Sequence, residues 1–337
     1  MAACGAFHVA AVTEDGELFT WGRGMDAQLA TGGLANELLP RRIGLLGGFR
    51  VVAAAAGHSH TAALTEDGAL WTWGDSEHGQ LGHGEFLAPT QLCLAPARVE
   101  TLKLAGASVR AIACGRHHCI VVATYGLVWT WGQGQHGALG TGDKADRRTP
   151  ACLGNTRLPA KSVSVAAGAT FSIALSDTGS IWTWGTSQRG CLGLESTAAS
   201  LIPAEVPPSS FDGPVTNVSA GLAHSLAVTA LMTTWAWGDG TYGRLGLGDS
   251  FDRWQPSQVG AGTAFAAVEI KQVVCGSAHS LALTLHGDLY SWGRGAQGRL
   301  GHSDNLDLFV PKRIHLSRPP GVLPVSVTAH THAYLYQ

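Results

Sequence analysis

A Trp-Gly dipeptide recurs six times along the chain and restricts the folds that this sequence can adopt. Successive tryptophans are separated by 52, 58, 53, 53 and 55 residues, and they are Trp21, Trp73, Trp131, Trp184, Trp237 and Trp292. Thirteen residues before each one lies a second fixed position, which holds His8, His60, His118, Phe171, His224 and His279. Three residues earlier comes a glycine, at Gly5, Gly57, Gly115, Gly168, Gly221 and Gly276. Such a period indicates a fold built from copies of one supersecondary unit.

Each unit has the sequence pattern of four short strands. A glycine lies eight residues after the histidine position in five units, as in Asp67-Gly68, and separates two apolar or aromatic runs, which is typical of a hairpin. The fifth unit has Met232 there. A Gly-x-Leu-Gly signature then follows Trp-Gly, as in Gly298 to Gly301. A sheet of this size has two open edges and too little core to stand alone, so the repeat predicts a β-propeller.

A second aromatic column lies two residues before the first, and it contains Phe19, Trp71, Trp129, Trp182, Trp235 and Tyr290. Because side chains two residues apart in a strand share one face of the sheet, both columns are expected on the same side of each blade. We expect them to pack one blade against the next.

These units resemble the regulator of chromosome condensation repeat, and the resemblance covers essentially the whole chain. It implies a seven-bladed propeller, a fold used in nucleotide exchange on a small GTPase, in giant ubiquitin ligases and in signalling scaffolds. The last segment repeats only a strand pair, with Ala329 in the glycine position. We therefore predict one all-β propeller over 1–337, with six full blades and a partial seventh. The predicted units are 1–50, 51–109, 110–162, 163–215, 216–270, 271–322 and the partial 323–337.

Charge and cysteine usage limit the partner and the compartment. The net charge is −2, so no broad positive surface is expected for nucleic acid. The seven cysteines show no disulfide framework, and the first residues do not form a cleavable signal, which indicates an intracellular protein, cytoplasmic or nuclear. The long uncharged stretch 214–238 contains many polar residues, so we interpret it as two strands and a turn rather than a membrane helix.

Two motifs resemble functional sites, but the repeat explains their residues better. Gly132 to Gly137 matches G-x-G-x-x-G, but no helix is expected after it, so we do not predict nucleotide binding. The segment Cys114 to Cys119 has the residue types of a zinc site. Strand alternation would place Cys114 and His118 on the face opposite His117 and Cys119, and small residues occupy the Cys114 position in other units. We therefore predict no metal, no cofactor and no catalytic residue.

The predicted function is a protein-interaction scaffold that presents variable loops on a rigid frame. The alternative is a guanine-nucleotide exchange factor, although the unit lengths leave little room for the wedging loop that the family resemblance implies for that activity. A buried structural role also explains the histidine column, because buried polar groups need partners. His224 and His332 are partner-binding candidates by resemblance. Trp254 is a third candidate, because it alone among the tryptophans lies outside the two aromatic columns.

Overall fold

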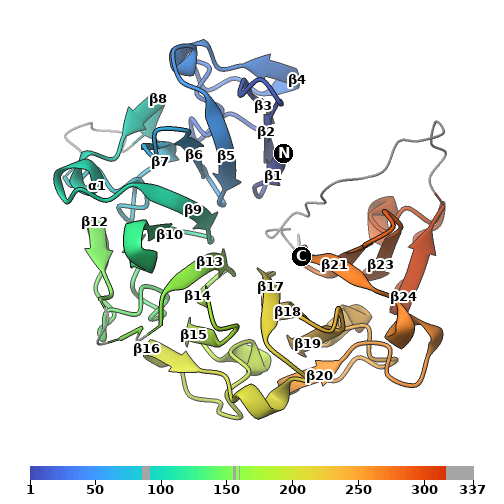
Figure 1. Ribbon diagram of the computed structural model, residues 1–337. Coiled ribbons are helices and arrows are strands. Elements are labelled where there is room, and N and C mark those ends of the chain that lie inside the picture. Colours follow the sequence, from blue (N-terminus) through green and yellow to red (C-terminus); the bar gives the residue numbers. More distant parts are fainter. Residues whose placement is uncertain (86–91, 155–156, 159, 316–337) are drawn as a thin grey trace.

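In a computed structural model, which describes residues 1–85, 92–154, 157–158 and 160–315, the chain forms a ring of blades that follow one another in chain order (Figure 1). The described residues contain six blades, and each is a four-stranded antiparallel sheet with its strands in sequence order. This confirms the predicted all-β propeller. The predicted partial seventh blade, 323–337, lies outside the described residues.

The strands of blades one to three are β1 (Ala2–Cys4), β2 (His8–Val12), β3 (Leu18–Gly22), β4 (Glu37–Arg42), β5 (Val51–Ala56), β6 (His60–Thr65), β7 (Leu70–Asp75), β8 (Leu92–Arg98), β9 (Val109–Cys114), β10 (His118–Ala123), β11 (Val128–Gly132) and β12 (Arg147–Cys152). Those of blades four to six are β13 (Ser162–Ala167), β14 (Phe171–Ser176), β15 (Ile181–Gly185), β16 (Ser200–Glu205), β17 (Val215–Ala220), β18 (His224–Thr229), β19 (Thr234–Gly238), β20 (Arg253–Gln258), β21 (Ile270–Cys275), β22 (His279–Thr284), β23 (Leu289–Gly293) and β24 (Leu308–Ile314).

Helical segments are short and lie between strands. The α-helix is α1 (Glu100–Leu104), before blade three. The 3-10 helices among the described residues are η1 (Gly44–Leu46), η2 (Thr124–Gly126), η3 (Gln188–Gly190), η4 (Pro208–Ser210), η5 (Thr241–Gly243), η6 (Ala264–Ala267) and η7 (Ala296–Gly298). The part of the chain that the structure describes includes no helix with the length and apolar character needed to cross a bilayer. Residues 215–238 form three strands, β17 to β19, rather than the two expected from the sequence.

The glycine of Trp-Gly is required by the backbone at the end of each third strand. Gly238 has a φ of 101°, a left-handed conformation that strains other residues. A Cβ atom there would lie 2.5 Å from the carbonyl oxygen of Ala223 in the adjacent turn. In the second hairpin of blade five, Met232 adopts the left-handed φ of 62° that glycine supplies in the other blades. The unit that departs in sequence therefore keeps the same turn geometry.

The hydrophobic core lies between neighbouring blades. One cluster combines Phe171 and Ile173 of blade four with Trp237 of blade five, and Trp235 packs against it. Trp73, Trp131, Trp184, Trp237 and Trp292 are completely buried, which confirms the predicted packing of one blade on the next. Trp21 of blade one is half-buried.

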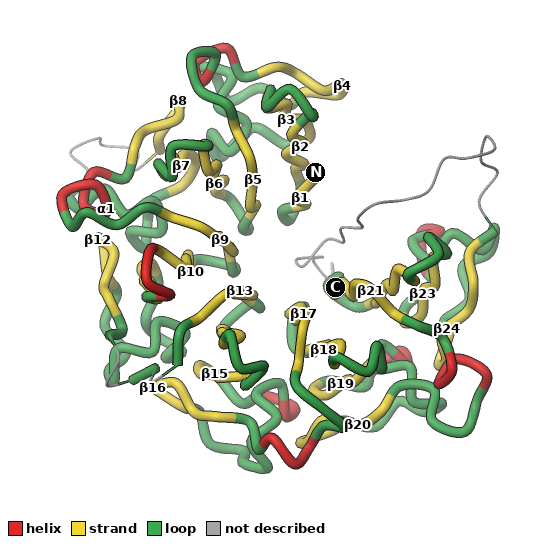
Figure 2. Tube along the Cα trace, viewed as in Figure 1, coloured by secondary structure: helices red, strands yellow, loops and turns green. Residues whose placement is uncertain are grey.

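The first strand of each blade lies nearest the axis of the ring (Figure 2). The six first strands line a central hollow of about 240 Å³, with β9 contributing Cys114. The glycine-rich connection after Trp-Gly lies farther out. In four blades the glycine two residues after Trp-Gly donates its backbone N–H to an Asp or Asn at the end of the connection, as Gly134 does to Asp146 Oδ1 at 2.8 Å. The G-x-G-x-x-G match is thus part of a closed structural loop.

Candidate functional site

The histidine of the repeat lies in the interior, between one blade and the next. Its Nε2 is hydrogen-bonded to a hydroxyl group of the following blade in three interfaces, and the pairs are His8 and Thr61 at 2.8 Å, His118 and Ser172 at 3.0 Å, and His224 and Ser280 at 3.0 Å. The hydroxyl donates in turn to a backbone carbonyl of the preceding blade, and the Trp-Gly indole N–H donates to the same oxygen. For Ser280 and Trp292 this acceptor is the Arg244 oxygen, at 2.7 and 2.9 Å.

We call this arrangement of histidine, hydroxyl group, backbone carbonyl and indole the inter-blade relay. His224 belongs to the relay between blades five and six. The His224 side chain is fully buried, so it does not reach a surface where a partner could touch it. This corrects the expectation of direct partner contact at His224. Burial lowers the pKa of His118 to about 3 and that of His224 well below its ordinary value, because the charged imidazole would lose its hydration. Both histidines are therefore neutral at physiological pH.

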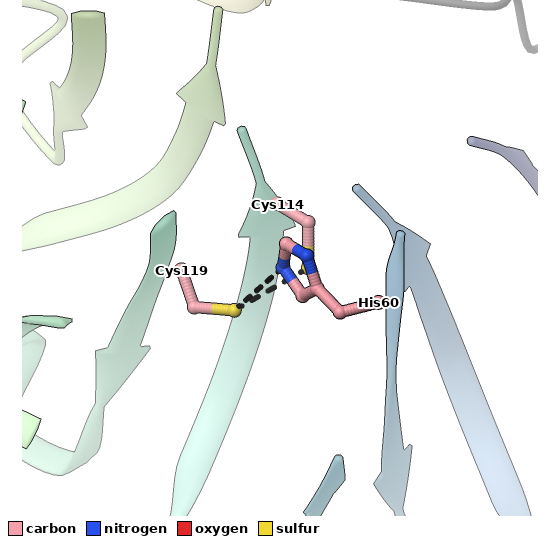
Figure 3. Close-up of side chains that lie close together, drawn as sticks. All are labelled: His60, Cys114 and Cys119. Carbon is pink, nitrogen blue, oxygen red and sulfur yellow. Dashed lines mark hydrogen bonds between the residues drawn. The ribbon is translucent and has the colours of Figure 1, made fainter. Parts of the chain in front are cut away.

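The relay between blades two and three has a different composition. Cys119 takes the place of the hydroxyl residue, and its Sγ lies 3.2 Å from His60 Nε2 and 3.3 Å from the Gln80 carbonyl oxygen (Figure 3). Cys114 Sγ lies 3.6 Å from Cys119 Sγ. Cys114 and Cys119 are cross-strand partners, so the expectation that they point to opposite faces is wrong. The turn between them reverses the chain, and alternation along one strand does not apply.

One end of the propeller gathers polar and aromatic side chains. We define the loop face as the turns between first and second strands together with the connections between third and fourth strands. The turns are residues 5–7, 57–59, 115–117, 168–170, 221–223 and 276–278, and the described connections are 23–36, 76–85, 133–146, 186–199, 239–252 and 294–307. The two sets meet through backbone hydrogen bonds, as Arg23 N donates to the Phe7 oxygen at 2.8 Å.

A cluster of aromatic rings crosses the loop face over blades one to three. The His58 ring contacts Phe7 and His117, with centroid distances of 6.0 and 5.5 Å, and His117 contacts His78 at 5.2 Å. Burial lowers the pKa of His58 to about 4 and that of His117 to about 3, and the positive charge of Arg116 acts in the same direction. His58 and His117 are thus neutral at physiological pH, and each can act as donor, acceptor and stacking surface.

An arginine and aspartate network lies over blades four and five of the loop face. Arg189 contacts Asp239 and Asp252 at 3.4 and 3.3 Å. The nearly buried Arg244 pairs with Asp239 at 2.8 Å. Arg244 also donates to the carbonyl oxygens of Thr241 and Ser277, at 2.9 and 3.2 Å. Arg189 thus links the connections of blades four and five, and Arg244 links blade five to the first turn of blade six.

Two apolar side chains of the loop face are exposed in blades five and six. Phe251 is 71% exposed and Leu306 is 68% exposed, and they occupy equivalent positions just before the aspartate that closes each connection. Nearby in the same connections, Arg294 lies 5.0 Å above the Tyr242 ring. Exposed apolar groups beside arginine are a composition found at protein interfaces.

The structure does not bring the three predicted candidates together. Trp254 is half-buried in β20, the outer strand of blade five, and its carbonyl oxygen accepts a hydrogen bond from Glu195 N at 3.2 Å. His224 is buried on the inner side of the same blade. His332 lies outside the described residues.

The repeat and the ring of blades fit a known family. Residues 1–333 match the RCC1-like domain. The chain belongs to this family. The ultraviolet-B receptor UVR8 of Arabidopsis thaliana is 33% identical over 314 residues, which cover 92% of this chain and 68% of UVR8. The human E3 ubiquitin-protein ligase HERC2 is 36% identical over 283 residues, which cover 83% of this chain and only 6% of HERC2.

Two solved structures agree with the fold. Human WBSCR16 superposes with a TM-score of 0.86 at 22% identity, over 99% of this chain and 86% of that one. Prp20p of Saccharomyces cerevisiae gives a TM-score of 0.81 at 23% identity, over 98% of this chain and 80% of that one. At these identities the likeness establishes the architecture.

Sequence reasoning missed most residues of the loop face of this RCC1-like domain. Arg189 and Asp252 are far apart in sequence, and His58 and His117 come from different blades. A signal was nevertheless available, because both histidines lie in the short turn before the repeat histidine. Comparing these turns between units would have shown variable residues on an otherwise constant frame.

Proposed function

We propose that this RCC1-like domain is a non-enzymatic protein-interaction scaffold and that its loop face receives a protein partner. The observation that carries this proposal is the contrast between the frame and the face. The position directly before the repeat histidine has nearly the same backbone environment in every blade, and it holds Phe7, Ser59, His117, Thr170, Ala223 and Ala278. A rigid frame that varies only its loop side chains is suited to recognition.

The chemistry of the face supports a protein as the partner. Phe251 and Leu306 offer apolar surface, and Arg294 offers a guanidinium group that can pair with a carboxylate. A net charge of −2 gives no general attraction for nucleic acid. We therefore propose a partner that presents apolar and acidic side chains together.

Two partner classes are the first to test. Prp20p binds Gsp1p and histones, and HERC2 is an E3 ubiquitin-protein ligase. On this basis we propose a small GTPase or a component of a ubiquitin or signalling assembly. The seven cysteines are all free, which supports work in the cytoplasm or the nucleus. Guanine-nucleotide exchange is the second candidate function, and the fold that this chain shares with Prp20p is the reason to test it.

A site-specific crosslinking experiment tests the scaffold proposal. A photoreactive phenylalanine analogue is placed at Phe251 on the loop face or at Leu231, which is 64% exposed in a turn at the opposite end. We expect crosslinks to a defined protein from position 251 and none to that protein from position 231. Adding Arg294→Ala to the protein labelled at position 251 should reduce the yield of these crosslinks. Equal crosslinking from both ends, or the absence of a defined product from position 251, would contradict the proposal.

A further inference from the structure

The relay between blades two and three contains three groups that bind soft metal ions. His60 of β6 lies in blade two, whereas Cys114 of β9 and Cys119 of β10 lie in blade three. Their ligand atoms all lie within 4.8 Å of one another, and all three residues are buried (Figure 3). No other group of three histidine, cysteine or acidic residues with this spacing occurs among the described residues.

The distances fit one small ion. Bonds of about 2.3 Å to sulfur and about 2.0–2.1 Å to nitrogen place ligands on a tetrahedral zinc ion about 3.5–3.8 Å apart. The two sulfur atoms are 3.6 Å apart, and the Cys119 sulfur lies 3.2 Å from His60 Nε2. The third pair, Cys114 Sγ and the ring nitrogen of His60, lies within 4.8 Å, so shifts of no more than about 1 Å would bring all three ligands onto one ion.

The repeat shows that packing alone does not require two cysteines here. The relay between blades five and six has the same layout with His224, Ser280 and Cys275, and Cys275 is the cross-strand partner of Ser280. One thiol and one hydroxyl therefore satisfy the same interior position. The second thiol, at Cys119, is what changes the relay into a set of two sulfurs and one imidazole.

We propose that His60, Cys114 and Cys119 form a structural zinc site that links blade two to blade three. Two thiolates and one neutral imidazole balance the charge of Zn²⁺, which a buried site requires. Three protein ligands leave one coordination position for a solvent molecule or a partner group. Cys114 borders the central hollow, from which that ligand and the ion can enter.

Alternation along one strand would point Cys114 and Cys119 apart, and His60 lies in the preceding blade, so no metal is expected from the segment Cys114 to Cys119. The structure brings the cysteines together across a hairpin and adds the imidazole from blade two. The proposed ligand set therefore spans an interface that no single unit displays.

The test measures metal content in the full chain, purified under reducing conditions, loaded with zinc and freed of unbound ion. We expect about one tightly held zinc per chain by elemental analysis. With Co²⁺ as the probe we expect the near-ultraviolet thiolate charge-transfer band. Cys119→Ser and Cys114→Ala should lose most of the zinc and this band. Cys275→Ala, which alters the matching position between blades five and six, should keep both.

The variants also separate metal binding from folding. Serine at position 119 and alanine at position 114 are the residues that other units carry at the same places, as in Ser280 and Ala56. We therefore expect circular dichroism spectra like that of the wild type. A zinc chelator should lower the melting temperature of the wild type and leave that of Cys119→Ser unchanged. Folded wild-type protein without retained zinc, or Cys119→Ser with undiminished zinc, would overturn the proposal.

Discussion

His118 shows how one residue position can tolerate two chemistries. Its imidazole is buried and hydrogen-bonded to Ser172, yet the equivalent position of the next blade holds Phe171. At the interface with Phe171, Ser225 still donates to the Cys191 carbonyl oxygen at 3.0 Å, so the hydroxyl keeps a partner without the histidine. The imidazole therefore adds to the relay but is not needed for its hydroxyl.

This predicts the behaviour of His118→Phe. At pH 7 the variant should lose only about 1 kcal/mol of unfolding free energy, the typical value of one hydrogen bond. Below pH 6.5 the unfolded histidine takes up a proton, whereas folded His118 does so only near its pKa of about 3. Protons therefore favour the unfolded chain in this window, by up to about 1.4 kcal/mol per pH unit for this group.

Urea unfolding at pH values from 7 to 4 measures the effect. The stability of the wild type should fall as the pH is lowered, and that of His118→Phe should fall less steeply. Parallel pH profiles would show that His118 remains neutral in both states or is charged in both. Ser172→Ala, which removes the hydroxyl partner but keeps the imidazole, is the control and should retain the steep dependence.

At the scale of the element, a blade is held by what its third strand inserts into the preceding blade. Trp237 of β19 is completely buried against blade four and donates its indole N–H to the Cys191 oxygen at 3.0 Å. We predict that Trp237→Ala lowers the free energy of unfolding by about 3–5 kcal/mol, as large truncations in a core do. Denaturant unfolding followed by circular dichroism measures the change.

Trp254→Ala is the matched control for this prediction, because Trp254 is half-buried on the outer strand of the same blade. Trp254→Ala should lower the free energy of unfolding clearly less than Trp237→Ala does. If the free energy of unfolding of Trp237→Ala did not differ measurably from that of the wild type, the blade interface would not depend on this side chain.

The blades were largely predictable from the sequence, and the sites between them were not. Trp-Gly, the repeat histidine and the hairpin glycines are local signals with fixed spacing, and they recur in nearly every unit. The pairing of His60 with Cys119 and of Arg189 with Asp252 depends on how neighbouring blades meet. Strand alternation failed at Cys114 and Cys119 because it ignored the turn that makes them cross-strand partners.

At the scale of the whole molecule, the ring has a regular loop face. The five completely described connections between third and fourth strands, 23–36, 133–146, 186–199, 239–252 and 294–307, have equal lengths. None of these five has an insertion that could serve as a wedge against a GTPase. The variation on this part of the face lies in side chains rather than in loop length.

This regularity predicts that the domain does not catalyse nucleotide exchange. Release of labelled GDP from a panel of small GTPases should proceed at the intrinsic rate in the presence of micromolar protein. The Phe251→Ser variant is measured in parallel. Acceleration by orders of magnitude that is lost in this variant would contradict the prediction and make the loop face an exchange site. Stable GTPase binding without acceleration would agree with the scaffold.

The inter-blade relay also gives a direction to each of the five interfaces between successive described blades. A blade offers an acceptor carbonyl to the blade that follows it, and it sends a hydroxyl or thiol and an indole back to the blade before it. Blades two to five therefore carry both halves of the joint, and they join their neighbours head to tail. Duplication or loss of one of these four blades would leave each new joint complete. In evolution, the number of blades could thus change in single steps, without coordinated changes at two surfaces.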